Sequence, residues 1–270
     1  MLGTSMKRAL ARVALAIAVV LEMAAPAAAQ GPVGVILMHG KQSSPNTPGL
    51  RDIASKAEAA GMKVVVPSMP WGSGGWEKIN VTPDQVFAMI DGYANQLRAQ
   101  GARRIVVGGQ SLGANVALSY AVARQNVAGV VMAAPGHSPI GSYRNPSIKD
   151  SIDQAVQLVK SGQASQPFSG LDDNQGSSIR MSTTAGVYAA WLNPRGQVSM
   201  PVQAPLLPAS IPVMVIIGTK DPGYGYMENS VYKPAAKNPY SKFLVIDGGD
   251  HRNTDQAASQ RIVDWIKGLP

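Results

Sequence analysis

The chain of 270 residues contains no cysteine. This absence excludes disulfide bonds, a thiolate metal site and a cysteine nucleophile. It also suits an oxidising compartment, where free thiols are at risk. Histidine is scarce, with three in the whole chain, so a reaction that needs an imidazole base has few candidates. No metal-ligand spacing and no dinucleotide or phosphate-loop fingerprint is present, and we expect neither a metal nor a cofactor.

Clustered positive charge is also lacking. The formal net charge is +8, but lysine and arginine are scattered, and no basic run is interleaved with aromatic residues. This distribution argues against nucleic acid as a partner. The charge itself bears on association and solubility and not on the fold.

The first 29 residues differ in composition from the remainder. A basic stretch around Lys7 and Arg12 precedes a short apolar run over residues 13–21, and small residues follow up to Ala29. This order is typical of a secretory signal peptide, which we predict over residues 1–29. The run is short for a transmembrane helix, which needs roughly 20 residues, although a membrane anchor or an unstructured tail stays open. Cleavage there predicts a bacterial periplasmic or secreted protein without a stable membrane anchor.

Beyond this segment, apolar runs alternate with stretches of helical periodicity. The expected strands cover residues 33–38, 63–66, 104–107, 127–133, 212–217 and 242–246. The expected helices cover residues 49–60, 83–100, 112–123 and 254–267. Because these strands are apolar throughout, the pattern predicts an α/β fold, a mostly parallel doubly wound sheet with helices on both faces. We expect one such domain over residues 30–270; the oligomeric state stays open.

One stretch interrupts the alternation. Residues 136–210 are rich in proline, glycine, serine and glutamine. Within them, apolar residues from Ile148 to Val159 predict one amphipathic helix, and Thr183–Leu192 is a candidate for a second. An unstructured insertion of this length is unusual inside a compact domain. We therefore expect a lid or cap.

A serine stands between glycines where a predicted strand meets a predicted helix. The sequence is Gly109-Gln110-Ser111-Leu112-Gly113. A G-x-S-x-G motif in this context predicts a strained turn that lifts the serine hydroxyl above the sheet. Glycines stand on either side because side chains there would collide. A phosphate-binding or plain glycine-rich turn is the alternative.

A serine hydroxyl needs a general base to act as a nucleophile. In this architecture the base follows the nucleophile along the chain, which disfavours His39. His251 comes after the last predicted strand, in a loop at the edge where strands end, and is the favoured base. His137, at the start of the irregular insertion, is the weaker candidate.

A carboxylate must orient the imidazole and stabilise its cation. Asp221 directly follows the penultimate predicted strand and lies between nucleophile and base in the sequence. Asp247 and Asp250 are rivals, but Asp250 adjoins the base and Asp247 ends a strand. Asp221 can also be read as a turn residue in an Asp-Pro-Gly bend.

Two backbone N–H groups are expected to stabilise the oxyanion. One is that of Leu112, the residue after the nucleophile. The other belongs to the loop after the first strand, where Lys41 is the candidate and Gly40 and Gln42 are alternatives. Lys41 is expected to act through its amide and not through its charge.

The residues expected to contact the substrate are Trp71 and Gln110. Trp71 and Trp76 lie in a glycine-rich loop at the same sheet edge, and Trp191 lies in the insertion. Packing beneath the loop is an equally good interpretation for these tryptophans.

Taken together, these motifs resemble the α/β-hydrolase family. The resemblance rests on "LMHG" after one strand, "GGQSLG" after another, "GTKDP" later and "GGDHRN" near the end, and it runs from about Val33 to the C-terminus. It implies the nucleophile, acid and base roles for Ser111, Asp221 and His251. The length and layout are similar to those of small esterases and dienelactone-hydrolase-like enzymes, but the latter use a cysteine.

The resemblance and the residues together predict an exported serine hydrolase that cleaves small-molecule or polymer esters through an acyl-enzyme. An amidase, peptidase or thioesterase would use the same three groups. A non-catalytic binding protein on the same fold is the alternative from another class.

Overall fold

The computed structural model describes residues 31–270, and the signal peptide expected over residues 1–29 lies outside the described part. A six-stranded sheet has the order β2-β1-β3-β4-β7-β8, with every neighbouring pair parallel. Its strands are β1 (Val33–Met38), β2 (Lys63–Val65), β3 (Arg104–Gln110), β4 (Gly129–Ala133), β7 (Val213–Gly218) and β8 (Lys242–Ile246). The predicted parallel α/β sheet is confirmed.

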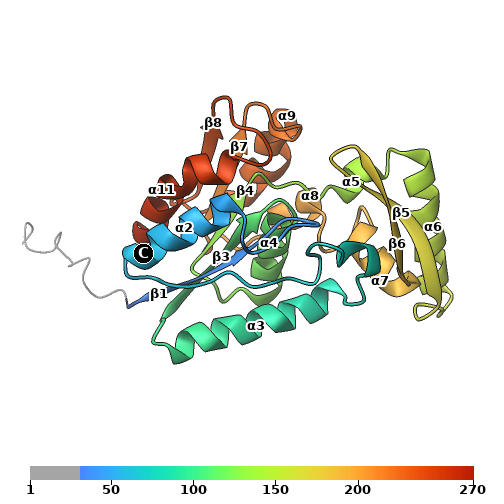
Figure 1. Cartoon of the computed structure of the whole chain (residues 1–270), viewed down its shortest axis with the longest axis horizontal. Coiled ribbons are helices and arrows are strands. Elements are labelled where there is room, and N and C mark those ends of the chain that lie inside the picture. Colours follow the sequence, from blue (N-terminus) through green and yellow to red (C-terminus); the bar gives the residue numbers. More distant parts are fainter. Residues whose placement is uncertain (1–30) are drawn as a thin grey trace, which may run out of the picture. The chain divides into compact units, whose positions relative to one another are not determined.

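Helices cover both faces of this sheet (Figure 1). Helices α2 (Pro48–Ala59) and α11 (Thr254–Lys267) pack together on one face, while α3 (Pro83–Ala99) and α4 (Leu112–Arg124) lie on the other. Successive strand residues point to opposite faces, so one strand serves two cores. In β1, Val35 and Leu37 join the α2–α11 core, and Ile36 and Met38 join the α3–α4 core. Burial on both faces explains the uninterrupted apolar runs.

Local capping contributes to these helix boundaries. Before α3, the Thr82 hydroxyl accepts a hydrogen bond from the Gln85 amide, and the Gln85 side chain accepts one from the Thr82 amide. Pro83 occupies the first helical position, where its missing N–H is not needed. Such a cap is worth about 1 kcal/mol, and it starts the helix where its sequence pattern predicts.

The segment 136–210 is folded and contains elements that the sequence pattern does not indicate. Helix α6 (Pro146–Lys160) confirms the predicted amphipathic helix, and α7 (Ala185–Leu192) confirms most of the second. Between them lies an antiparallel hairpin of β5 (Pro167–Asn174) and β6 (Ser177–Thr184). Two of the three buried positions of β5 are Gly170 and Asp172, so apolar residues do not alternate along this strand. The segment thus packs as a helix–hairpin–helix unit (Figure 1).

Short helical turns complete the described part. These are η2 (Trp76–Lys78), α5 (Pro139–Ser142), α8 (Met200–Gln203), η3 (Ala204–Leu206), α9 (Tyr224–Met227), η4 (Glu228–Tyr232) and α10 (Lys233–Ala235). No helix within residues 31–270 combines the length and the apolar character that crossing a bilayer requires.

Candidate active site

Ser111 occupies a strained turn between β3 and α4. Its backbone angles are φ 56° and ψ −121°, in a region that residues with a side chain rarely adopt. A Cβ atom at Gly109 or at Gly113 would collide with the carbonyl oxygen of Met38 at the end of β1. Both positions therefore admit only glycine, because the neighbouring strand lies against the turn.

His251 and Asp221 complete a hydrogen-bonded chain to this serine. His251 Nε2 lies 3.0 Å from Ser111 Oγ, and His251 Nδ1 lies 2.7 Å from Asp221 Oδ2. The other carboxylate oxygen, Oδ1, accepts a hydrogen bond of 2.7 Å from the Gly223 amide. Ser111 and Asp221 are buried, while the His251 side chain is 12% exposed. The fold thus brings the three expected residues together in the order that acyl transfer requires.

The other two histidines are occupied elsewhere. His39 Nε2 accepts a hydrogen bond from the Met69 amide at 3.0 Å, so its Nδ1 carries the proton and donates to the Gly40 carbonyl at 2.9 Å. Burial lowers the pKa of His39. His137 Nε2 lies 2.9 Å from the Trp191 carbonyl oxygen and donates to it. Neither imidazole is free to act as the base.

The rival carboxylates bond to groups other than the His251 ring: Asp247 to the loop after β7, and Asp250 within its own loop. Asp247 Oδ1 accepts a hydrogen bond from Thr219 Oγ1 at 3.3 Å. Asp250 Oδ1 accepts from the amides of Arg252 and Asn253 at 2.8 and 3.0 Å. Asp250 therefore shapes the turn that carries the base without contacting its ring.

Gly136 is a residue of this site that the sequence analysis missed. A Cβ atom there would lie 2.5 Å from His251 Cε1 and 2.7 Å from Ser111 Oγ. The backbone after β4 therefore passes directly over the Ser111–His251 pair, and any side chain would obstruct the serine hydroxyl. The Pro-Gly-His sequence by itself gives no sign of this, because a glycine after a strand is commonly just a turn residue.

The expected oxyanion donors lie beside the serine. Leu112 is the first residue of α4, and a Cβ atom on Gly40 would lie 3.1 Å from Ser111 Cβ, which places the start of the Lys41 peptide next to it. Within residues 31–270, neither the Leu112 nor the Lys41 N–H donates to a protein acceptor. Two free amides next to a serine hydroxyl suit a tetrahedral oxyanion.

Gln110 and Trp71, the expected substrate contacts, differ in position. Gln110 lines a cavity beside Ser111, and its side-chain amide donates to the His251 carbonyl at 2.8 Å. Trp71 is fully buried, and its indole N–H donates to the His39 carbonyl at 2.8 Å. Trp71 therefore packs beneath the loop, and its assignment as a substrate contact is corrected.

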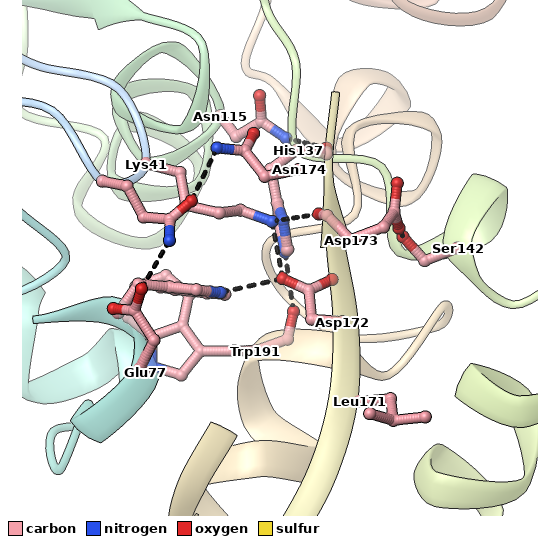
Figure 2. A network of polar contacts seen from close by, with 12 residues as sticks. Lys41, Glu77, Asn115, His137, Ser142, Leu171, Asp172, Asp173, Asn174 and Trp191 are labelled. Carbon is pink, nitrogen blue, oxygen red and sulfur yellow. Dashed lines mark hydrogen bonds and ion pairs between the residues drawn. The ribbon is translucent and has the colours of Figure 1, made fainter. Parts of the chain in front are cut away.

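The Lys41 side chain takes part in a buried ion pair (Figure 2). Its Nζ lies 2.6 Å from Asp172 Oδ2 and 2.9 Å from the Asp173 carbonyl oxygen, both on β5. The indole N–H of Trp76 donates to the same Asp172 oxygen at 2.8 Å. Burial alone would raise the pKa of Asp172, but the Lys41 charge and the hydrogen bonds from Lys41 and from the Asp173 amide together outweigh it and lower the pKa of the carboxyl. The sequence gives no sign of a pair 131 residues apart whose acidic member lies on an unpredicted hairpin.

His137 borders this ion pair and stays uncharged. Its ring packs edge-on against Trp76, with centroids 5.6 Å apart, and its backbone carbonyl accepts a hydrogen bond from Asn115. Burial, reinforced by the positive charge of Lys41, lowers the pKa of His137 to about 4. The imidazole is thus a neutral hydrogen-bond donor at neutral pH.

We expect the free energy of unfolding to fall as the pH drops from 6.5 to about 4. In this window the unfolded chain protonates His137 and the native protein does not, so lower pH favours unfolding. The full effect is on the order of 3 kcal/mol. Urea unfolding across this window should show a shallower pH dependence in His137→Gln, whose amide can still donate to Trp191. Equal slopes in the two proteins would contradict the assignment, and buried His39 accounts for a residual slope.

Two cavities flank the serine, each of about 510 Å³. We call them the Tyr226 lobe and the Arg252 lobe; Ser111, His251 and Lys41 border both. The Tyr226 lobe is further lined by Pro135, Ser138, Ser142, Asp173, Pro222 and Tyr226. The Arg252 lobe is further lined by Gln42, Ser43, Thr47, Gln110, Arg252 and Asp255. In the described part of the chain, neither lobe is lined by leucine, isoleucine, valine, methionine, phenylalanine or tryptophan.

No group of histidine and carboxylate side chains within residues 31–270 is arranged to hold a metal ion. The chemistry available at this site is that of the serine hydroxyl, the imidazole, the carboxylate and the free amides.

Comparison with known proteins gives a family and a fold. A family model described as the alpha/beta hydrolase family matches residues 35–265. A search of curated proteins found no match. Among solved structures, a monoacylglycerol lipase from Paleococcus ferrophilus is 18% identical, with a TM-score of 0.61 over 87% of this chain and 93% of the lipase.

Two further structures show the same architecture. A thermostable carboxyl esterase from Bacillus coagulans is 14% identical, with a TM-score of 0.60 over 89% of this chain and 91% of the esterase. Est1E from Butyrivibrio proteoclasticus, solved with ferulic acid bound, is 15% identical, with a TM-score of 0.58 over 90% of each chain. At these identities the likeness concerns the fold. With a family model that covers most of its length, the chain belongs to the alpha/beta hydrolase family.

Proposed function

We propose that this protein is a serine hydrolase that cleaves carboxylic esters. The observation that carries the proposal is the hydrogen-bonded chain from Ser111 through His251 to Asp221. Esterases and lipases among the structurally similar proteins support ester hydrolysis as its reaction class.

In the first half-reaction, Ser111 Oγ attacks the ester carbonyl and transfers its proton to His251 Nε2. Asp221 accepts the Nδ1–H hydrogen bond, which keeps Nε2 unprotonated beforehand and stabilises the imidazolium afterwards. The carbonyl oxygen becomes an oxyanion that the Leu112 and Lys41 amides stabilise. Collapse of the tetrahedral intermediate breaks the ester C–O bond, and His251 gives its proton to the departing alcohol.

In the second half-reaction, water replaces the alcohol. His251 takes a proton from the water as its oxygen attacks the acyl-serine carbonyl, and the same amides stabilise the second oxyanion. Collapse releases the carboxylic acid and returns the proton to Ser111 Oγ. The Tyr226 and Arg252 lobes give the acyl and alcohol parts of the substrate separate places beside the serine, and water enters after the alcohol has left.

The lining of these lobes favours substrates with short or polar groups on both sides of the ester bond. Serine, glutamine, aspartate and arginine side chains offer hydrogen bonds, and apolar lining is confined to Pro135, Pro222 and Tyr226 in the Tyr226 lobe and Pro48 in the Arg252 lobe. Long acyl chains would gain little there, because their affinity comes from apolar surface removed from water.

The predicted signal peptide and the folded segment 136–210 suggest where the enzyme acts and what shapes its site. We propose that residues 1–29 direct export, so that hydrolysis takes place in the periplasm or outside the cell. Segment 136–210 supplies Ser138, Ser142 and Asp173 to the Tyr226 lobe, which supports a cap that sets specificity.

A panel of p-nitrophenyl esters tests this function. We expect kcat/KM for decanoate not to exceed that for acetate or butyrate, because a chain of methylenes that stays exposed to water adds no binding energy. Matched anilides and thioesters in the same panel identify an amidase, peptidase or thioesterase. A folded protein that hydrolyses none of them and does not react with a fluorophosphonate would instead be a binding protein, and the proposal would be wrong.

A further inference from the structure

The β5–β6 hairpin is joined to the loop that follows β1 by a continuous set of polar contacts (Figure 2). Lys41 Nζ contacts Asp172 and the Asp173 carbonyl, and the side-chain amide of Asn174 donates to Gln42 Oε1 at 2.9 Å. Three consecutive hairpin residues therefore contact two consecutive loop residues. The loop after β1, which carries the expected oxyanion donor Lys41, is thus bound through its side chains to the β5–β6 hairpin.

The central contact of this set is shielded from water. The Lys41 side chain is 5% exposed and the Asp172 side chain is fully buried. Trp76 lies under the Lys41 ammonium, 4.8 Å from it to the ring centroid, and donates its indole N–H to Asp172. A charge pair in such surroundings holds its geometry closely, because either charge without its partner would be strongly penalised.

The loop backbone is held on its other side as well. The Gln42 amide donates to the Trp71 carbonyl at 2.8 Å, and the Gln42 side chain donates to Glu77 Oε1 at 2.5 Å. Gln42 has a φ of 55°, an unfavourable value for a residue with a side chain. Contacts must therefore maintain this bend, which follows directly after Lys41.

We propose that Asp172 is a positioning residue: by anchoring the Lys41 ammonium, it holds the Lys41 N–H at the place of the oxyanion. This inference rests on the proposed ester hydrolysis. The hairpin of segment 136–210 thereby contributes to the reaction through the backbone of another loop, without touching the reacting atoms.

A double-mutant cycle tests this role. In Asp172→Asn, whose carbonyl can still accept from Trp76, kcat for p-nitrophenyl acetate should fall about 100-fold, as for loss of one oxyanion donor, with KM nearly unchanged. The melting temperature should fall as well, because Lys41 is left as an unpaired buried charge. In Lys41→Met/Asp172→Asn neither charge remains, so the melting temperature should largely recover while kcat stays low.

If Asp172 had a purely structural role, the melting temperature and kcat would fall together and recover together. If kcat recovers together with the melting temperature in the double variant, or if KM rises while kcat is kept, the positioning role is overturned. Asp153→Asn is the matched control, since it breaks the exposed Lys149–Asp153 ion pair in the same segment. That variant should keep both kcat and KM.

Hydrogen exchange tests the inference independently of turnover. The Gln42 and Ser43 amides donate within or beside the loop, to Trp71 and Gly40 carbonyls. In Asp172→Asn and in Lys41→Met/Asp172→Asn, these two amides should exchange faster than in the wild type. The exchange rates of the central sheet should stay unchanged. Wild-type protein that hydrolyses no ester would refute the proposed function, whereas unchanged loop exchange in both variants would refute this inference.

Discussion

Ser111→Ala is expected to reduce kcat for p-nitrophenyl acetate by roughly a millionfold, the order found when a serine nucleophile is removed from a triad. The methyl group cannot form the acyl-enzyme, while the oxyanion donors and the two lobes remain and leave a small residual rate. Loss of the burst of p-nitrophenol and of fluorophosphonate labelling should accompany the loss of steady-state turnover.

A buried serine on the helix that follows provides the matched control. Ser119 is 2% exposed, and its hydroxyl donates to the Asn115 carbonyl at 2.9 Å. Ser119→Ala removes a hydroxyl from α4 without touching the Ser111–His251 pair, so turnover should stay near that of the wild type. Equal turnover of Ser111→Ala and wild type would show that another group is the nucleophile.

Asp221→Asn is expected to lower kcat about ten-thousandfold while the protein stays folded. The Gly223 amide donates to Asp221 Oδ1, so the side-chain carbonyl of an asparagine would remain on that side. Its NH₂ group would then face His251 Nδ1 and donate to it. This places the imidazole proton on Nε2, toward Ser111, where the base needs a free lone pair. The pH profile of kcat distinguishes this tautomer effect from misfolding, because activity should reappear at high pH if hydroxide replaces the base.

Asp247→Asn is the control for Asp221→Asn, and it also tests directly whether the rival carboxylate Asp247 is the acid of the site. Asp247 is exposed, and within residues 31–270 its side chain accepts a hydrogen bond only from Thr219. Its neutral variant should retain wild-type kcat and KM. A large loss in Asp247→Asn together with an active Asp221→Asn would reverse the assignment of the acid.

The sequence by itself determined the sheet, its helices and the region of the site. The apolar run Val33–Met38 coincides with β1, because a strand buried on both faces leaves a local signal that needs no knowledge of its partners. Ser111 could be found for the same reason, since the strand, the tight turn and the helix around it are consecutive in the chain. The shortage of histidine then left few candidates for the base.

Only the tertiary structure decided how the site is completed. Gly136 lies over the serine, Trp71 is buried under its loop, and Asp172 reaches Lys41 from a hairpin more than a hundred residues away. None of these follows from local periodicity, because each depends on which backbone passes beside another after the sheet has formed. The hairpin itself escaped prediction because two of the buried positions of β5 are Gly170 and Asp172, which leave no apolar alternation along the strand. The nucleophile could therefore be predicted because its strand, turn and helix are contiguous in the sequence. The contacts that hold this turn and its neighbouring loop in place form only when the chain folds.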